Sequence, residues 1–274
     1  MGQRHLPGAL VVSDTYRTLR GDNWAQALGA CLSDPPGDMP TWMEQHTRLL
    51  KSDTYSRVGL LRIKEQTCCL KLYIAKSFMQ RLGFRLGIGR GITAFDAADR
   101  LLVAGLHVPT PRACLLVPEG MLLLTQGVED SRDLRGLWLA EPIEQIASQY
   151  LQRAGEILSV LHHAGFSHGD CKWSNLLWSG ETFFLVDLED VRRVGTARTE
   201  ITSLHARQLQ DVARFTADAE ALGASAGQYE TFLGSYCSGA DSLREQLLDG
   251  IRPLVAFIRK RHQKKYGHRH EPLV

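Results

Sequence analysis

One stretch of this sequence concentrates side chains that could move a phosphoryl group. It reads His168-x-Asp170-x-Lys172-x-x-Asn175, and an apolar run that ends at Asp187 follows it. A carboxylate in such a loop can orient an acceptor hydroxyl and take its proton, and Asp170 suits that role. Amide and carboxylate oxygens are ligands that Mg²⁺ prefers, so we expect Asn175 and Asp187 to hold magnesium.

Two lysines complete the expected chemistry. Lys71 lies between the apolar residues Leu70 and Leu72 in a β-rich run, and a lysine at such a position can grip the α- and β-phosphates of ATP. Lys172 follows Asp170 by two residues and could steady the charge of the transferred phosphate. The pattern therefore predicts ATP and Mg²⁺ as cofactors, with Asp170 and Lys172 as the catalytic pair.

The first half of the chain is predicted to be a small sheet with one long helix. Residues 56–75 are β-rich around a polar turn, which predicts a hairpin whose second strand carries Lys71. Residues 93–104 have helical spacing, and residues 113–125 read as a second hairpin. The expected N-terminal lobe covers residues 1–125.

The second half is predicted to be helical. Apolar residues recur at helical spacing from 143 to 161, and short strand-like runs follow at 175–178 and 183–186. Beyond residue 203 we expect two or three more helices. The whole is an α+β, two-lobed architecture with a helical C-terminal lobe at residues 126–274.

The catalytic loop resembles that of the protein-kinase-like superfamily, in which H-x-D-x-x-x-x-N precedes a metal-binding Asp. The chain is most similar to the bacterial lipopolysaccharide core kinases, which phosphorylate heptose or Kdo. The similarity rests on the segments HGDCKWSNLLW, VDLEDVRR, GLHVPTP and DVARF, and it covers most of residues 56–215. It implies a protein-kinase-like fold with MgATP between the lobes and Gln126 at the connector among the nucleotide contacts. It also implies that Asp211 braces the catalytic loop.

Two features depart from this family pattern. Kinases pair the strand lysine with a helix Glu, and no Glu occurs between residues 66 and 118. We expect Asp99 to pair with Lys71 instead; Asp96, which has the spacing of a helix cap, or no acid at all stays open. The glycine-rich phosphate loop is also missing, because Gly87-Ile-Gly89-Arg-Gly91 follows the lysine strand rather than preceding it.

The acceptor is expected to be small or lipid-linked. Position 169 is Gly, where regulated protein kinases carry an Arg that reads a phosphorylated loop. The expected function is therefore ATP-dependent phosphorylation of a sugar hydroxyl in the lipopolysaccharide inner core. One alternative is a small-molecule kinase of the aminoglycoside or choline type, against which Lys172 weighs. The other is a non-catalytic pseudokinase scaffold, which the intact catalytic residues oppose.

Composition narrows the cellular setting. The 274 residues hold 32 Lys and Arg against 30 Asp and Glu, which disfavours a general nucleic-acid binder. Six cysteines without a CxxC pair indicate a reducing compartment, and no signal peptide or membrane span is expected. We therefore expect a cytoplasmic protein, with possible peripheral contact to the inner membrane through the basic segments 76–91 and 259–270.

Overall fold

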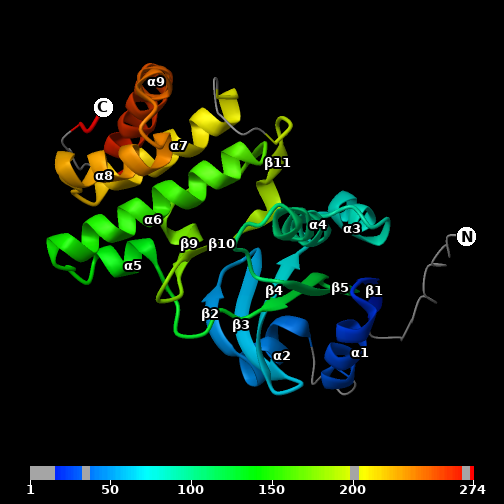
Figure 1. Ribbon diagram of the computed structural model, residues 1–274. Coiled ribbons are helices and arrows are strands. Elements are labelled where there is room, and N and C mark those ends of the chain that lie inside the picture. Colours follow the sequence, from blue (N-terminus) through cyan, green and yellow to red (C-terminus); the bar gives the residue numbers. More distant parts are fainter. Residues whose placement is uncertain (1–15, 33–37, 198–203, 267–271) are drawn as a thin grey trace, which may run out of the picture. The chain divides into compact units, whose positions relative to one another are not determined.

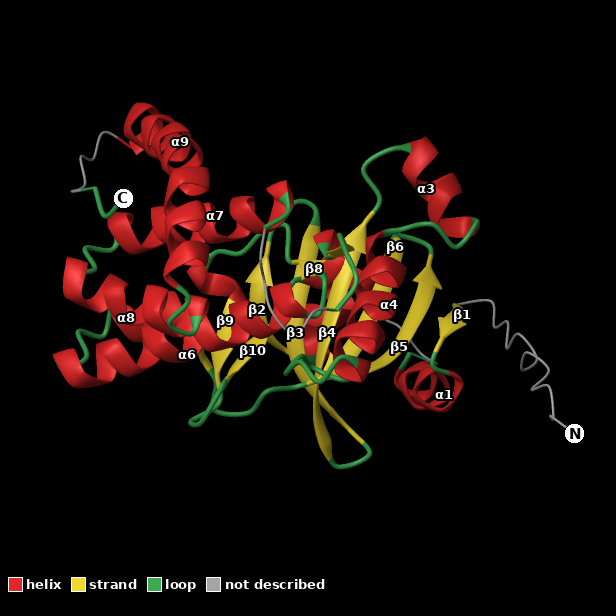
Figure 2. Cartoon of the chain, turned by 45° about the horizontal axis from the view of Figure 1, so that its top comes forward, coloured by secondary structure: helices red, strands yellow, loops and turns green. Residues whose placement is uncertain are grey.

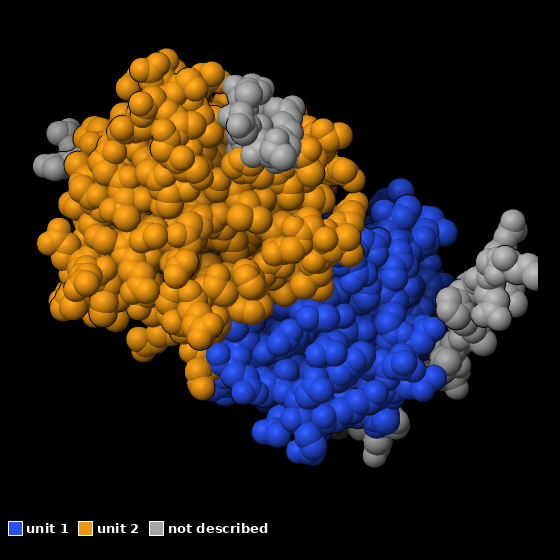
Figure 3. Space-filling view, viewed as in Figure 1, with its two compact units in different colours: residues 1–99, 109–129 blue, residues 100–108, 130–274 orange. Residues whose placement is uncertain are grey.

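The computed structural model describes residues 16–32, 38–197, 204–266 and 272–274. The chain separates into two compact units (Figure 3). The first comprises residues 1–99 and 109–129, and the second comprises residues 100–108 and 130–274. The first unit thus continues past the expected lobe boundary at residue 125 and ends at Glu129. The mixed helix and strand content confirms the α+β class.

The first unit is built on a six-stranded antiparallel sheet (Figures 1 and 2). Lys71 lies in the middle of a central strand, opposite Val58 on one neighbour and Leu123 on the other. Both expected hairpins are confirmed. In spatial order the strands are β1 (Arg17–Arg20), β5 (Pro111–Val117), β6 (Gly120–Gln126), β4 (Gln66–Ile74), β3 (Ser56–Ile63) and β2 (Arg48–Ser52).

Side chains alternate between the two faces of this sheet, as the strand period requires. On β4, Leu70 and Leu72 face a core shared with the helices α1 (Asp22–Cys31) and α2 (Met39–His46). Tyr73 belongs to a second core, formed with α3 (Phe78–Arg85) and α4 (Arg90–Val103). The ammonium group of Lys71 lies 4.8 Å from the centre of the Tyr73 ring.

The start of α4 differs from the expectation. The helix begins at Arg90, so Thr93 is not its cap; the Thr93 hydroxyl donates to the carbonyl of Gly89 at 3.2 Å. Asp96 therefore lies inside α4, where its carboxylate pairs with Arg20 of β1 at 3.0 Å. The capping role considered for Asp96 is wrong, because the helix is one turn longer at its N-terminal end.

The second unit holds the catalytic segment between two helices. Its helices are α5 (Leu134–Trp138), α6 (Glu144–His163), α7 (Ala206–Ala221), α8 (Ala226–Cys237) and α9 (Asp241–Tyr266). Short strands lie between α6 and α7. The strands β9 (Leu176–Trp178) and β10 (Phe183–Leu185) form the expected hairpin, extended by β7 (Arg132–Asp133), and β8 (Phe166–Ser167) pairs with β11 (Arg192–Arg193).

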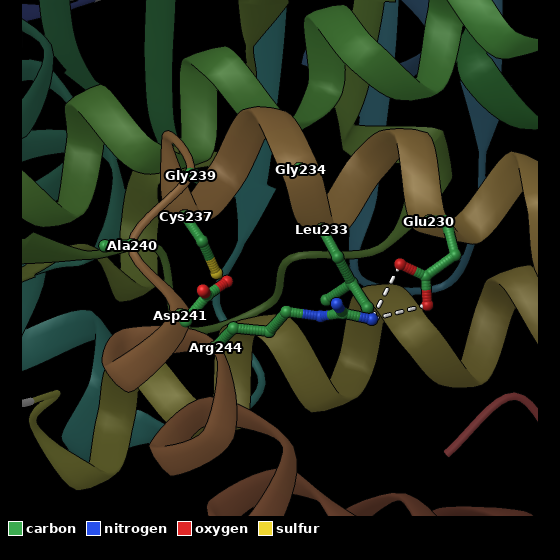
Figure 4. A pocket seen from close by; sticks show the side chains of 8 residues that line it. All are labelled: Glu230, Leu233, Gly234, Cys237, Gly239, Ala240, Asp241 and Arg244. Atoms are coloured by element: carbon green, nitrogen blue, oxygen red, sulfur yellow. Dashed lines mark hydrogen bonds and ion pairs between the residues drawn. The ribbon is translucent and has the colours of Figure 1, made fainter.

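Two further features of the described residues bear on function. No described helix combines the length and apolar character needed to cross a bilayer. A cavity of about 110 Å³ is lined by residues of α8, of α9 and of the turn between them (Figure 4). Two of its charged groups pair, since Arg244 donates to both carboxylate oxygens of Glu230 at 2.7 Å, and Asp241 lines the cavity as well. None of the predicted site residues lines this cavity, so it is separate from the predicted site.

Candidate active site

The backbone of the catalytic loop is held by Asp211 of α7. One carboxylate oxygen accepts the N–H of His168 at 2.6 Å, and the other accepts the N–H of Gly169 at 2.7 Å. Asp211 is buried, so these charge-assisted hydrogen bonds form away from water, where they are strong. The expectation that Asp211 braces the loop is confirmed.

Asp211 is itself supported by two buried residues that the sequence analysis did not single out. The Nε2 atom of His162 lies 3.4 Å from the Asp211 carboxylate, and the Nδ1 atom lies 2.6 Å from the hydroxyl of Tyr236. Because a carboxylate only accepts, Nε2 carries the proton and Nδ1 accepts from Tyr236. Burial holds the pKa of Tyr236 well above its ordinary value, so the hydroxyl keeps its proton.

His168 connects the loop to the strand that ends at Asp187. Its ring is fully buried, and Nε2 donates to the carbonyl of Val186 at 3.0 Å. Its Nδ1 accepts the N–H of Asp170 at 3.4 Å. Both ring nitrogens are thus engaged with the backbone, which gives His168 a structural role.

The expected base converges with two of its predicted partners. The ammonium group of Lys172 lies 2.7 Å from a carboxylate oxygen of Asp170. The amide of Asn175 donates to the Asp170 carbonyl at 2.9 Å and lies 3.4 Å from the same carboxylate oxygen. The side chains of Asp170 and Lys172 are partly exposed, so a substrate can reach them.

The oxygen atoms expected to hold magnesium suit that ion. Asn175 directs its amide nitrogen at Asp170, which leaves its amide oxygen for a cation. The N–H of Val186 donates to the Asn175 carbonyl at 3.0 Å. Asp187 is therefore the next residue after one that is hydrogen-bonded to Asn175. Asp187 has φ 65°, a left-handed conformation that Asp tolerates better than most residues. One amide and one carboxylate oxygen fit Mg²⁺, which takes its remaining ligands from phosphates and water.

The backbone at position 169 accommodates only glycine. Gly169 has φ 89°, and a Cβ there would lie 2.7 Å from the carbonyl oxygen of Asp190, so no larger residue fits. The Arg of regulated protein kinases has no room at this position.

Cys171 is fully buried, and burial raises its thiol pKa well above the ordinary value. It is therefore inert despite lying next to Asp170.

The remaining predicted residues lie in the first unit. Asp99 is exposed, and partial desolvation together with the nearby charge of Asp96 raises the pKa of its carboxyl, with Arg20 acting in the opposite direction. Lys71 is not among the charges that act on it, and Asp99 forms no ion pair within the described part of the chain. The expected pair of Lys71 with Asp99 is thus not formed. The Gln126 side chain accepts the Thr110 hydroxyl at 3.0 Å.

A tight turn stands before the Lys71 hairpin, where a glycine-rich loop would be expected. It joins β2 to β3, and Asp53 holds it closed. One carboxylate oxygen of Asp53 accepts the backbone N–H groups of Tyr55 and Ser56, each at 2.8 Å. The other accepts the Ser56 hydroxyl at 3.1 Å and lies 3.1 Å from the Lys51 ammonium group. These contacts hold the pKa of the Asp53 carboxyl far below its usual range.

Comparison with known proteins agrees with this geometry. A model of the lipopolysaccharide kinase (Kdo/WaaP) family matches residues 41–236. The chain belongs to this family. The solved structure of WaaP in complex with acyl carrier protein covers 84% of this chain and 93% of that one, with a TM-score of 0.56 and 16% identity. At that identity the likeness shows the kinase-like fold alone.

A third match concerns a protein with a different printed activity. The probable glycine dehydrogenase (decarboxylating) subunit 2 of Nitrosococcus oceani is 28% identical over 171 residues, or 54% of this chain. The chain spans about a third of that relative's length, 33%. The activity in that name is a property of that protein and is not assigned to this chain.

The part of the chain that matches the Kdo/WaaP family contains every predicted site residue, together with His162 and Tyr236. These last two could not be found from the local sequence. His162 has helical spacing and reads as a core residue, and Tyr236 lies 74 positions further along the chain. Only the packing of α6 against α8 brings them together.

Proposed function

We propose that this member of the Kdo/WaaP family is an ATP-dependent kinase that phosphorylates a sugar hydroxyl, heptose or Kdo, of the lipopolysaccharide inner core. The observation that carries the proposal is the convergence of Lys172 and Asn175 on Asp170, on a loop fixed by a buried carboxylate. Phosphoryl transfer depends mainly on positioning and on charge stabilisation, and this loop supplies both.

In the proposed reaction Asp170 accepts the proton of the acceptor hydroxyl as the hydroxyl oxygen attacks the γ-phosphorus. The bond from that phosphorus to the β–γ bridging oxygen breaks, and ADP leaves. Lys172, 2.7 Å from Asp170, lies close enough to neutralise charge on the transferred group. The short Lys172–Asp170 contact would also hold the carboxylate in position before the acceptor binds.

The proposal also assigns residues to magnesium and nucleotide binding. Asn175 and Asp187 would hold Mg²⁺, which supplies charge neutralisation at the phosphates when it is bound. Lys71 would bind the α- and β-phosphates. Gln126, at the end of β6, would contact the nucleotide at the connector; its side chain is already fixed by Thr110. Asp99 is not proposed as the partner of Lys71, because the two residues do not pair.

A lipid-linked acceptor fits better than a peptide. Gly169 leaves no room for an arginine that would read a phosphorylated loop. The protein would bind this acceptor at the cytoplasmic face of the inner membrane, as a peripheral membrane protein.

The decisive experiment measures transfer of labelled γ-phosphate from ATP, with Mg²⁺, to dephosphorylated lipopolysaccharide core. Wild type is compared with Asp170→Asn, Asp170→Ala and the control Asp249→Asn, whose carboxylate makes an exposed ion pair with Arg252. We expect the wild type and the control to incorporate label and the Asp170 variants to lose about 100-fold or more.

Other outcomes point elsewhere. Absence of transfer with ATP still bound would overturn the acceptor class and favour a small-molecule kinase. Soluble sugars and aminoalcohols would then be tested as acceptors. Absence of any MgATP-dependent rise in melting temperature would favour the scaffold.

A further inference from the structure

One side of α3 and the turn after it exposes a row of large apolar side chains. Phe78 is 77% exposed, and Leu86 and Ile88 are each 69% exposed. Met79 and Leu82 are exposed as well. Helical spacing places Phe78, Leu82 and Leu86 one above another. Single exposed apolar residues are ordinary, but a contiguous group of this kind marks an interaction surface.

The opposite side of α3 is fixed to its unit. Phe84 is buried in the core that contains Tyr73 and Met121. The guanidinium of Arg17 donates to the backbone carbonyl of Arg85. The Ser77 hydroxyl caps the helix by accepting the N–H of Gln80 at 3.2 Å. The helix therefore has a defined position, and its apolar row faces outward because the inner side is already filled.

The chain segment that carries this row has charge of one sign. No Asp or Glu occurs from Gln66 to Phe95. Arg81 and Arg85 are exposed, and they lie one helical turn apart beside the apolar row. Lys76, just before α3, is exposed too and lies over the ring of Tyr55 at 3.6 Å. An apolar row flanked by arginines is typical of helices that lie in the headgroup region of anionic membranes.

The other basic segment lacks this combination. At the end of α9, Arg259 is engaged by Glu220, with guanidinium–carboxylate distances of 2.6 and 2.9 Å. Lys260 and Arg261 are exposed, but among the described residues of α9 Phe257 is the one large apolar side chain that is exposed. The membrane contact expected through 259–270 therefore has little support in the described part of that segment; residues 267–270 lie outside it.

We propose that residues 76–88 bind the protein to anionic phospholipid headgroups, with Phe78, Leu82 and Leu86 inserted among them and Arg81 and Arg85 contacting phosphates. The inference rests on the proposed location of the kinase at a membrane surface. It assigns the contact to one helix, α3, and it does not involve the catalytic residues.

The test is co-sedimentation of the full chain with vesicles of phosphatidylcholine alone and of phosphatidylcholine with about 30% phosphatidylglycerol. We expect binding only to the anionic vesicles, weakened by salt. The variant Phe78→Ala/Leu82→Ala should lower the partition coefficient about tenfold or more, because it removes the inserted groups. The variant Arg81→Gln/Arg85→Gln should lower it by a similar factor at low salt.

The controls carry matched changes on α9. Phe257→Ala and Lys260→Gln/Arg261→Gln should bind as wild type does, and all variants should keep the wild-type melting temperature. Equal binding to both kinds of vesicle, or equal losses from the α3 and α9 variants, would overturn the proposal. Transfer of phosphate to delipidated core sugar, measured on the same preparations, distinguishes this failure from failure of the proposed kinase activity.

Discussion

The hydroxyl of Tyr236 lies 2.6 Å from Nδ1 of His162, and through that ring it supports the carboxylate that fixes the catalytic loop. The support is directional. Tyr236 donates to His162, His162 donates to Asp211, and Asp211 accepts two backbone N–H groups of the loop. Tyr236, His162 and Asp211 are buried, so loss of the Tyr236 or His162 donor leaves an unsatisfied acceptor.

Tyr236→Phe should therefore affect both stability and turnover. We expect unfolding free energy to fall by about 1–3 kcal/mol and kcat to fall severalfold, with the KM for ATP unchanged. The matched control is Tyr229→Phe on the same helix, which removes an equally short buried contact, 2.6 Å to Thr216. That control should lose stability and keep kcat. Equal kcat losses in the two variants would remove the special role of Tyr236.

Gly169→Ala should inactivate the protein. The new Cβ would meet the Asp190 backbone at 2.7 Å, in a conformation that already disfavours side chains. We expect kcat to fall roughly 100-fold or more, because the neighbouring Asp170, the proposed base, is displaced. Gly180→Ala is the comparison, since Gly180 has φ 98° and nothing within 4 Å. It should cost about 1 kcal/mol of stability and no activity; an active Gly169→Ala enzyme would contradict the loop geometry.

Lys172→Met should lower kcat about 100-fold with little change in the KM for ATP. The lysine contacts Asp170, and its charge is expected to act on the group in transfer rather than on the bound nucleotide. Kinetics with varied ATP, run beside the exposed-lysine control Lys260→Met, separate the two constants. A rise in KM without loss of kcat would place Lys172 in nucleotide binding instead.

Lys71→Met and Asp99→Asn should behave differently. Lys71 is proposed to contact phosphates, so its loss should reduce the MgATP-dependent rise in melting temperature. Asp99 does not pair with Lys71 in the structure, so Asp99→Asn should keep that rise. Equal reductions in both variants would restore the pairing expected from the sequence.

Cys171 should resist alkylation in the native protein. Burial, followed by the nearby charge of Asp211, raises its thiol pKa, so the reactive thiolate is scarce at neutral pH and stays scarce as the pH rises to the ordinary thiol value. Mass spectrometry after iodoacetamide treatment should find Cys31, which is exposed, labelled first. Cys171 should react only after denaturation; native labelling at the rate of Cys31 would contradict its burial.

The sequence predicted the catalytic loop and its hairpin because those residues lie within one short segment. Asp170, Lys172 and Asn175 meet through local turns, and local pattern is what a sequence displays most directly. The two central hairpins were predictable for the same reason, since apolar runs flank a turn.

Other elements had weaker local signals. All five residues of β2 are exposed, so no alternation marks it, and β1 is four residues long. The helix α3 had a signal in Ser77-x-x-Gln80, a capping pattern that a glycine-rich context obscures. The spacing that favoured Asp99 could not tell which side of α4 faces Lys71.

The turn closed by Asp53 has a consequence for how this protein can hold a nucleotide. Loops that cradle phosphate do so with vacant backbone N–H groups. Here the N–H groups of Tyr55 and Ser56 already hold a carboxylate, so the turn contains an anion of its own. A nucleotide bound near it would gain no amide cradle, and its affinity would depend on Lys71 and on the divalent ion. Such binding should weaken steeply with ionic strength, and removing the metal should abolish it.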